Sequence, residues 1–75
     1  MRGFYKLNDG MLIYAPNFVE GPNVSLRTED HANYTYPVDG WCWFDTLLEV
    51  QWHFGFSDEE LRMQLDLPDS YDIAA

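Results

Sequence analysis

The chain has 75 residues, a hydrophobic content of 47% and a formal net charge of −9. That length allows one small domain, since domains typically run about 100–150 residues. The hydrophobic content argues against intrinsic disorder, and a single cysteine excludes a disulfide framework. A chain this short buries only about 60–65% of its unfolded surface, so we expect self-association to add stability.

The charge is distributed unevenly along the chain. Four basic residues face 13 acidic ones, and most of the acidic residues follow residue 38. Four Lys and Arg side chains are too few to neutralise nucleic-acid phosphates or an anionic lipid surface. We therefore expect no direct nucleic-acid binding and no membrane binding. The acidic surface either serves solubility alone or attracts a basic partner.

The N-terminal segment carries no targeting sequence. Residues 1–10 lack the basic and apolar regions of a signal peptide, and no run approaches the roughly 18 apolar residues of a membrane span. The unpaired Cys42 is typical of a reducing compartment. We therefore expect a cytoplasmic protein and, because the chain begins with Met1, a complete small gene product.

The first 15 residues predict a β-hairpin. Two runs rich in strand formers, residues 3–7 and 11–15, flank Asn8-Asp9-Gly10, a sequence typical of tight turns. A two-residue turn pairs Leu7 with Leu12. A three-residue loop shifts every partner by one and moves it to the other face. Both registers are open at this point.

Residues 16–33 are less regular. They contain several turn sequences, a weak strand pattern over 24–27 and a polar stretch over 28–33 that we interpret as a loop. Phe18 and Val19 are expected to attach this connection to the core. A connection this long in so small a domain is typical of a binding loop, unless it hides an element that the pattern does not reveal.

A second hairpin is predicted around Pro37-Val38-Asp39-Gly40. Aromatic, strand-forming arms at residues 34–36 and 41–44 flank this turn. Alternation along the second arm places Trp41 and Trp43 on one face and the other two side chains on the opposite face. Because both faces are apolar, the arm is a central strand or is covered by a helix or a second subunit.

Two capping boxes mark two helices. A helix is predicted over residues 46–54 that ends at Gly55; either Asp45 or Thr46 can cap it, and Thr46-Leu-Leu-Glu49 fits the capping box. Ser57-Asp-Glu-Glu60 predicts a shorter helix over 58–65. Both boxes place a hydroxyl three residues before a carboxylate, which satisfies two free backbone amides.

The first predicted helix carries two apolar stripes. Leu47, Val50 and Phe54 lie on one stripe, which is expected to cover the sheet. Leu48 and Trp52 lie on a second stripe about 100–140° round from Leu47. This second stripe provides more apolar surface than is needed to cover a small sheet.

Together these elements predict an α+β fold. Two β-hairpins form a small antiparallel sheet, covered by the helix over 46–54 and the shorter helix over 58–65. Residues 1–65 form a single small domain and residues 66–75 an acidic C-terminal tail. The tail alternates acidic with apolar residues, and we favour a frayed end over a docking peptide.

The residues offer little for catalysis. The densest potential metal ligands are Glu29-Asp30-His31, but neighbouring side chains in an extended loop point in opposite directions and chelate poorly. Cys42 lies between two tryptophans in a predicted strand, a setting that raises the thiol pKa and makes the thiol inert. We therefore expect no catalytic residue, no cofactor, no metal and no enzymatic activity.

The segment Tyr34 to Asp45, YTYPVDGWCWFD, resembles a stretch found in small proteins of unknown function from marine bacteriophages and marine metagenomes. The opening segment FYKLNDGMLIYAPN, Phe4 to Asn17, is similar in character. The resemblance implies a phage or cyanobacterial context, in which the cytoplasm is that of the host. It brings no activity and no site residue.

Two functional hypotheses follow. The first is a non-enzymatic protein–protein interaction module that self-associates as a homodimer through surplus apolar surface. Its candidate interface is Trp41, Trp43, Leu48 and Trp52. The second is an acidic phage-type inhibitor or nucleic-acid mimic that binds a basic host protein, and it requires one continuous acidic face. That candidate face is Asp58, Glu59, Glu60, Asp66, Asp69 and Asp72.

Overall fold

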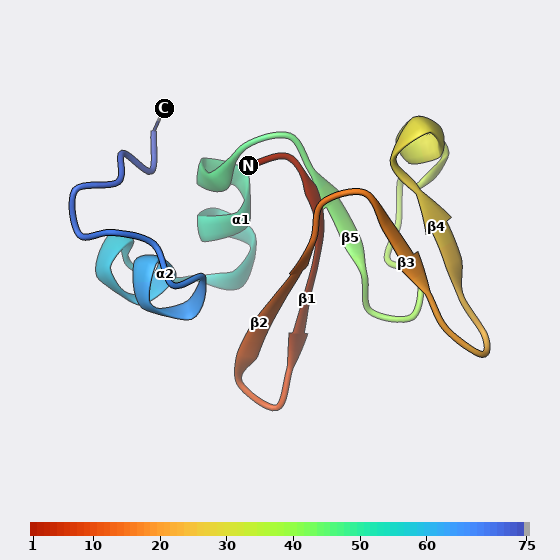
Figure 1. The fold of residues 1–75 in the computed structure, drawn as a ribbon, viewed down its shortest axis with the longest axis horizontal. Coiled ribbons are helices and arrows are strands. Elements are labelled where there is room, and N and C mark those ends of the chain that lie inside the picture. The colour runs from red at the N-terminus through yellow and green to blue at the C-terminus, as the bar shows by residue number, and fades with distance from the viewer. Residues whose placement is uncertain (75) are drawn as a thin grey trace.

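A computed structural model describes residues 1–74 and confirms the α+β fold (Figure 1). The elements in chain order are β1 (Gly3–Asn8), β2 (Met11–Ala15), β3 (Phe18–Glu20), β4 (Ser25–Arg27), the 3₁₀ helix η1 (Thr28–Asn33), β5 (Cys42–Phe44), α1 (Leu47–Phe54) and α2 (Asp58–Gln64). The strands form a three-stranded sheet in the order β2-β1-β5 and a two-stranded sheet of β3 and β4, and all pairings are antiparallel.

The first hairpin has the two-residue turn. Leu7 pairs with Leu12 and Asn8 with Met11, so the three-residue alternative is wrong. The turn residues Asp9 and Gly10 have φ values of 52° and 78°. Positive φ at both central positions matches the right-handed twist of the strands, which is why an Asp-Gly pair selects this register.

The predicted arm at residues 34–36 forms no strand. A single bridge between Val38 and Trp41 closes the turn, and β5 pairs instead with β1. The ring of Tyr34 packs across the sheet onto Phe4, with ring centroids 5.8 Å apart. The segment therefore crosses a face of the sheet instead of extending its edge, and the following Pro37 offers no amide to a ladder.

The second hairpin lies at residues 18–27. Gly21 donates its N–H to the carbonyl of Val24 at 2.9 Å and closes the turn between β3 and β4. Val19 and Leu26 pair and are both buried. Three-residue strands are too short for an alternating pattern to reveal, which explains why the sequence suggested only a weak strand here.

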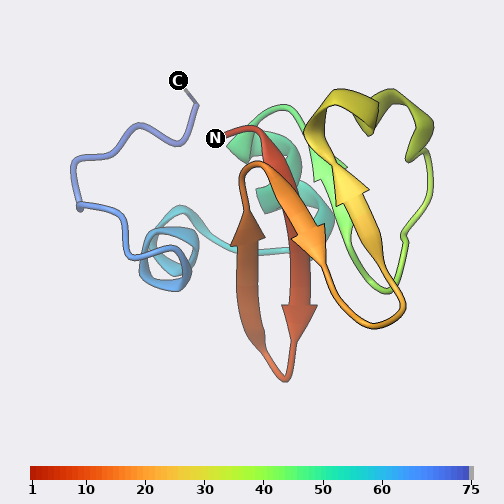
Figure 2. The same ribbon diagram turned by 45° about the vertical axis from the view of Figure 1, so that its right-hand side comes forward.

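The three-stranded sheet is the middle layer of the molecule. Alternation along β1 sends Phe4 and Tyr5 to opposite faces, and both are fully buried. The Phe4 face is covered by the β3–β4 hairpin, with buried Val19 and Leu26 (Figure 2). The Tyr5 face is covered by the two helices and the C-terminal segment. Its core residues are Tyr5, Leu12, Phe44, Leu47, Val50, Leu61 and Ile73.

Both helices begin after a predicted cap residue, but the capping box predicted at Thr46 is incomplete, because the Glu49 carboxylate accepts the Thr46 hydroxyl instead of the Thr46 amide. The Thr46 hydroxyl accepts from the Glu49 amide, and Gly55 ends α1 in the left-handed conformation with φ 77°. At α2, Ser57 and Glu60 form the complete capping box. The carboxylate and the hydroxyl each accept one amide that the helix leaves free, so α2 begins at a fixed residue despite being only seven residues long.

The C-terminal segment packs onto the core. Ile73 is only 3% exposed and belongs to the larger core cluster, with Leu67 and Tyr71 packed beside it. The Arg62 Nε donates to the carbonyl of Tyr71 at 3.0 Å. Residues 66–74 therefore do not form a frayed end, because their apolar positions supply part of the cover over the sheet. Residue 75 of the predicted tail lies outside the described residues.

Candidate interaction surfaces

The indole of Trp43 is engaged within the chain. Its ring stacks on His31 at 4.5 Å and meets the Phe4 ring edge-on at 5.0 Å. The Arg2 guanidinium lies 5.1 Å from the indole centroid, and the indole Nε1 donates to an Asp45 carboxylate oxygen at 3.2 Å. These contacts engage the ring and the polar edge of the side chain.

The four residues of the predicted interface therefore divide into two groups. Trp41 and Trp43 are half-buried against the smaller core cluster, beneath the β3–β4 hairpin. Leu48 and Trp52 lie one turn apart on the outer side of α1, and Trp52 is 79% exposed. We call Leu48 and Trp52 the α1 stripe. Only this half of the predicted interface offers free apolar surface.

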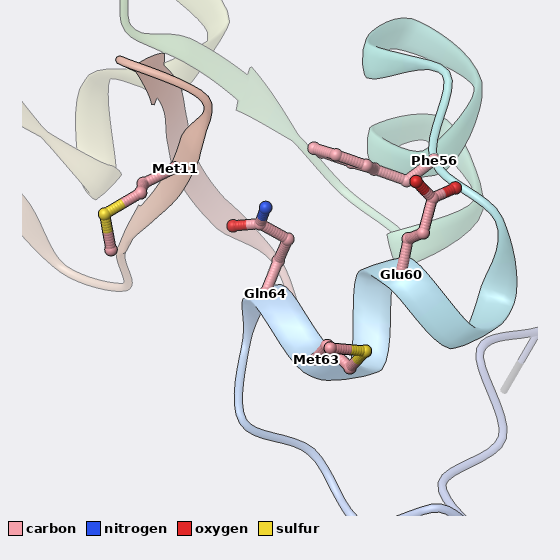
Figure 3. Close-up of a pocket in the computed structure, with 5 residues that line it drawn as sticks. All are labelled: Met11, Phe56, Glu60, Met63 and Gln64. Atoms are coloured by element: carbon pink, nitrogen blue, oxygen red, sulfur yellow. The ribbon is translucent and has the colours of Figure 1, made fainter.

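A hollow of about 430 Å³ lies between the β1–β2 hairpin and α2 (Figure 3). We call it the methionine groove. It is lined by Met11, Phe56, Glu60, Met63 and Gln64. Met11 is 68% exposed and Met63 76% exposed, so two flexible apolar side chains flank the opening. Figure 3 shows Met11 on the hairpin side, with the Gln64 amide between it and the Phe56 ring.

Gln64 joins the two sides of the methionine groove. Its Nε2 donates to the carbonyl of Gly10 at 3.0 Å, and its Oε1 accepts the Leu12 amide at 2.9 Å. A side-chain amide that binds the carbonyl and the amide on either side of Met11 reproduces the bonding of a neighbouring parallel strand. Because β2 is an edge strand, these bonds both cover part of its free edge and fix α2 beside it.

Glu60 places a charge at the rim of the methionine groove. Its carboxylate accepts the Ser57 amide at 2.9 Å, and its own amide donates to the Ser57 hydroxyl at 3.1 Å. The hydrogen bonds to Ser57 lower the pKa of Glu60. The side chain is therefore ionised at neutral pH, and its second oxygen is available to a partner.

A second hollow, of about 410 Å³, adjoins the first. We call it the acidic hollow. It is lined by Glu59, Arg62, Met63 and Asp69, so Met63 lines both hollows. The structure thus brings three residues of the predicted acidic face, including Glu60, to two adjoining hollows. The guanidinium of Arg62 is already held by the backbone at Tyr71.

The other three predicted acidic residues are placed differently. Asp58 accepts a hydrogen bond from the Gln51 side chain, and Asp72 accepts the Ala74 amide at 3.0 Å. Asp66 is exposed and has a positive φ of 54° where the chain leaves α2. These residues line neither hollow, and two of them fix the local backbone or the junction between the helices.

Every basic side chain of the chain has an intramolecular contact. Lys6 lies 3.9 Å from Asp39, and Arg27 lies 3.0 Å from Glu20. Arg2 lies over Trp43, and Arg62 binds a backbone carbonyl. Within residues 1–74, only Glu20 and Asp39 among the acidic residues form an ion pair. The remaining acidic groups of the described residues form no ion pair.

A smaller hollow of about 200 Å³ lies between residues 34–37, β5 and the end of α1. Its lining includes Tyr34, Tyr36, Cys42, Trp43 and His53. Burial raises the pKa of the Cys42 thiol, so the thiolate that nucleophilic chemistry requires is disfavoured. In the part of the chain that the structure describes, no three His, Cys, Asp or Glu side chains are grouped to hold a metal ion.

The methionine groove could not be predicted from the sequence. Gln64 meets Gly10 across 54 positions and Leu12 across 52, and no local pattern reports such a contact. Met11 and Met63 each fit an ordinary strand or helix position. The capping box at Ser57 and Glu60 was the one visible cue, because it fixes which side of α2 carries Glu60.

The chain matches no protein-family model, no curated protein and no solved structure. No helix formed by residues 1–74 combines the length and the apolar character needed to cross a bilayer.

Proposed function

We propose that this chain is a non-enzymatic protein-interaction module that self-associates through the α1 stripe. The observation that supports this most strongly is Trp52, an indole left 79% exposed on a regular helix, with Leu48 one turn earlier. Exposed apolar groups of this size mark interfaces, and tryptophan is enriched among the residues that dominate binding energy.

A two-fold arrangement suits the α1 stripe. When two copies of α1 meet antiparallel across a symmetry axis, Leu48 of one copy contacts Trp52 of the other, and the reverse contact forms at the same time. The helix has eight residues and is therefore about 12 Å long. It is too short to bury the roughly 800 Å² per partner of a standard interface. We therefore propose a weak homodimer that dissociates in the micromolar range or above.

Sedimentation equilibrium of matched variants tests this proposal. Trp52→Ala removes the central contact from an exposed position, so the chain should stay folded and become monomeric. Phe18→Ala is the control, because Phe18 is also an exposed aromatic (54%) but lies on β3. Loss of association in Trp52→Ala alone supports the α1 stripe. Equal association of wild type and Trp52→Ala contradicts it.

A second function is supported by the charge distribution. We propose that the module also binds a basic protein, as an acidic inhibitor or nucleic-acid mimic does. The support is that all four basic side chains are engaged within the chain, whereas Glu59, Glu60 and Asp69 gather at two adjoining hollows. Unneutralised carboxylates on one surface steer a cationic partner and select against anionic ones.

Capture of basic proteins from a lysate at two salt concentrations tests the second function. The variant Glu59→Gln/Glu60→Gln/Asp69→Asn should lose capture, whereas Asp9→Asn/Glu29→Gln/Asp30→Asn, which has the same net charge, should keep it. Capture by wild type should weaken with salt, because exposed charges are screened beyond about 8–10 Å. Equal capture by the two variants contradicts a localised acidic face.

We place both functions in the cytoplasm, which is that of the host if a phage encodes the chain. The support is the single, unpaired Cys42. Detection of the native protein in a cytoplasmic fraction would agree with this placement, and its recovery from an oxidising compartment would contradict it.

A further inference from the structure

We propose that the methionine groove and the acidic hollow together dock one segment of a partner protein, which carries an apolar side chain next to a Lys or Arg. The inference rests on the second function proposed above and names its site and the chemistry of its partner. The two hollows share Met63, so one continuous surface presents an apolar half and an acidic half.

The apolar half is formed by flexible side chains around a ring. Met11 and Met63 are 68% and 76% exposed, and Phe56 is half-buried between the helices. Methionine adapts to ligands of different shape because its side chain is unbranched and polarisable. A hollow of 430 Å³ lies within the range of about 300–1,000 Å³ that ligand sites occupy. It therefore accommodates a Leu, Met or Phe side chain.

The acidic half selects a cation. Glu59 and Asp69 line the acidic hollow, and Glu60 lines the methionine groove. None of these three carboxylates forms an ion pair among the described residues. The one guanidinium present, that of Arg62, donates to the Tyr71 carbonyl, and its positive charge offsets one of the two carboxylates of the acidic hollow. With Glu60 of the methionine groove, the two hollows keep an excess of negative charge for a Lys or Arg of a partner.

The frame of the site is fixed before a partner arrives. Gln64 holds α2 against β2 through two hydrogen bonds, and the Ser57 capping box fixes the first turn of α2. A site whose backbone is already ordered loses less conformational entropy on binding. Only exposed side chains, those of the two methionines and of the carboxylates, need to become ordered when the partner binds.

The charge also excludes the other occupants. A second copy of this chain carries a net charge of −9, and its four basic side chains are engaged internally. A nucleic acid or an anionic lipid would bring further negative charge to the acidic hollow. The occupant that remains is a basic, amphipathic segment of a partner protein.

Methionine methyl NMR with a defined peptide tests the inference. The chain contains three methionines, and Met1 packs against the larger core and lines neither hollow. The probe is an amphipathic peptide of Leu and Lys about 14 residues long, which is about four helical turns. We expect the Met11 and Met63 methyl signals to shift on titration, and the Met1 signal to stay in place.

Variants with matched controls separate the two halves of the site. Met63→Gln should weaken peptide binding about tenfold, as expected for loss of a central apolar contact. Glu59→Gln/Asp69→Asn should weaken it about three- to tenfold at low salt. The controls are Trp52→Gln, on the α1 stripe, and Glu29→Gln/Asp30→Asn, with the same change in net charge. Both controls should bind as wild type does.

Two further peptides distinguish the outcomes. A peptide in which Ser replaces Leu keeps the charge, and equal binding of this peptide overturns the apolar half while the second function stands. A peptide in which Glu replaces Lys keeps the apolar face, and equal binding of this peptide overturns the acidic half. Shifts that spare Met11 and Met63 overturn the site alone. Absence of binding by every Lys-containing peptide overturns both the site and the second function.

Discussion

Cys42 lies on the face of β5 that packs against the larger core, opposite Tyr5. Burial raises the pKa of its thiol, so the thiolate fraction at neutral pH is lower than for an exposed cysteine. We expect slow labelling of Cys42 by a thiol reagent in the native protein and fast labelling in denaturant. Cys42→Ala should cost about 1 kcal/mol of unfolding free energy through lost packing. Native labelling as fast as labelling in denaturant would contradict the placement of Cys42.

Tyr5 gives the fold a dependence on alkaline pH. Its ring is fully buried, its hydroxyl donates to the Met1 carbonyl, and burial is the largest cause that raises its pKa. Because the folded chain holds the phenol proton more tightly, the unfolded chain loses it first. The contribution of Tyr5 to the free energy of unfolding should therefore be constant below the ordinary tyrosine pKa of about 10 and fall as the pH rises above it.

The variant Tyr5→Phe tests this assignment. It keeps the ring and removes the ionisable hydroxyl, so it should lose about 1 kcal/mol at neutral pH and decline less steeply in alkali. Urea unfolding over a pH series measures both effects. If wild type and Tyr5→Phe declined in parallel above the ordinary tyrosine pKa, a group other than Tyr5 would be responsible.

At the scale of the elements, the contact between α2 and β2 depends on Gln64. Gln64→Met keeps the side-chain length and removes both hydrogen bonds, so we expect a loss of about 1–2 kcal/mol of unfolding free energy. The reverse exchange one residue earlier, Met63→Gln, changes an exposed side chain and should cost less than about 0.5 kcal/mol. Equal effects of the two exchanges would show that the hydrogen bonds carry little stability.

Loss of Gln64 should also affect solubility. The free edge of β2 would offer the Leu12 amide and the Gly10 carbonyl to another chain, as unprotected edge strands do. Light scattering at high protein concentration should therefore rise in Gln64→Met and not in Met63→Gln. Scattering that stays at the wild-type level would mean that other features protect this edge.

Elements that are fixed by neighbouring residues could be predicted from the sequence. Asp9-Gly10 selected the hairpin, Thr46 and Gly55 bounded α1, and Ser57 with Glu60 began α2. Each of these cues acts within about four residues, through backbone conformation or a cap.

Elements that depend on distant contacts could not be predicted. β5 pairs with β1 across about 40 residues, and Tyr34 packs onto Phe4 instead of extending a hairpin. Both arrangements bury apolar side chains on the two faces of one sheet. No local sequence pattern encodes such long-range packing. For the same reason the sequence indicated that Trp43 carries apolar surface but not that His31 and Phe4 cover it. The exposure of Trp52 followed from helical spacing alone.

At the scale of the whole molecule, like charges oppose folding and self-association. The net charge is −9, and the two ion pairs of residues 1–74 are partly exposed and contribute little. Added salt screens the repulsion, so the Tm should rise when NaCl is increased from about 20 to about 500 mM. Thermal unfolding followed by circular dichroism measures this change. A Tm that falls with salt would mean that local ion pairs outweigh the net charge.

Salt should act in opposite directions on the two proposed interactions. Screening weakens the attraction between the acidic hollow and a cation, but it also weakens the repulsion between two acidic copies that meet through the α1 stripe. A basic partner should therefore dissociate as salt rises, whereas the homodimer should become tighter. Opposite responses would show that the acidic hollow and the α1 stripe act independently.

Sedimentation equilibrium over a concentration series at low and high NaCl tests the interaction module most directly. We expect the mean mass to rise from 8.8 kDa towards twice that value as concentration increases, and to rise at lower concentration in high salt. Trp52→Ala should remain at the monomer mass throughout. A wild-type mass of 8.8 kDa at every concentration and at both salt concentrations would contradict self-association through Leu48 and Trp52.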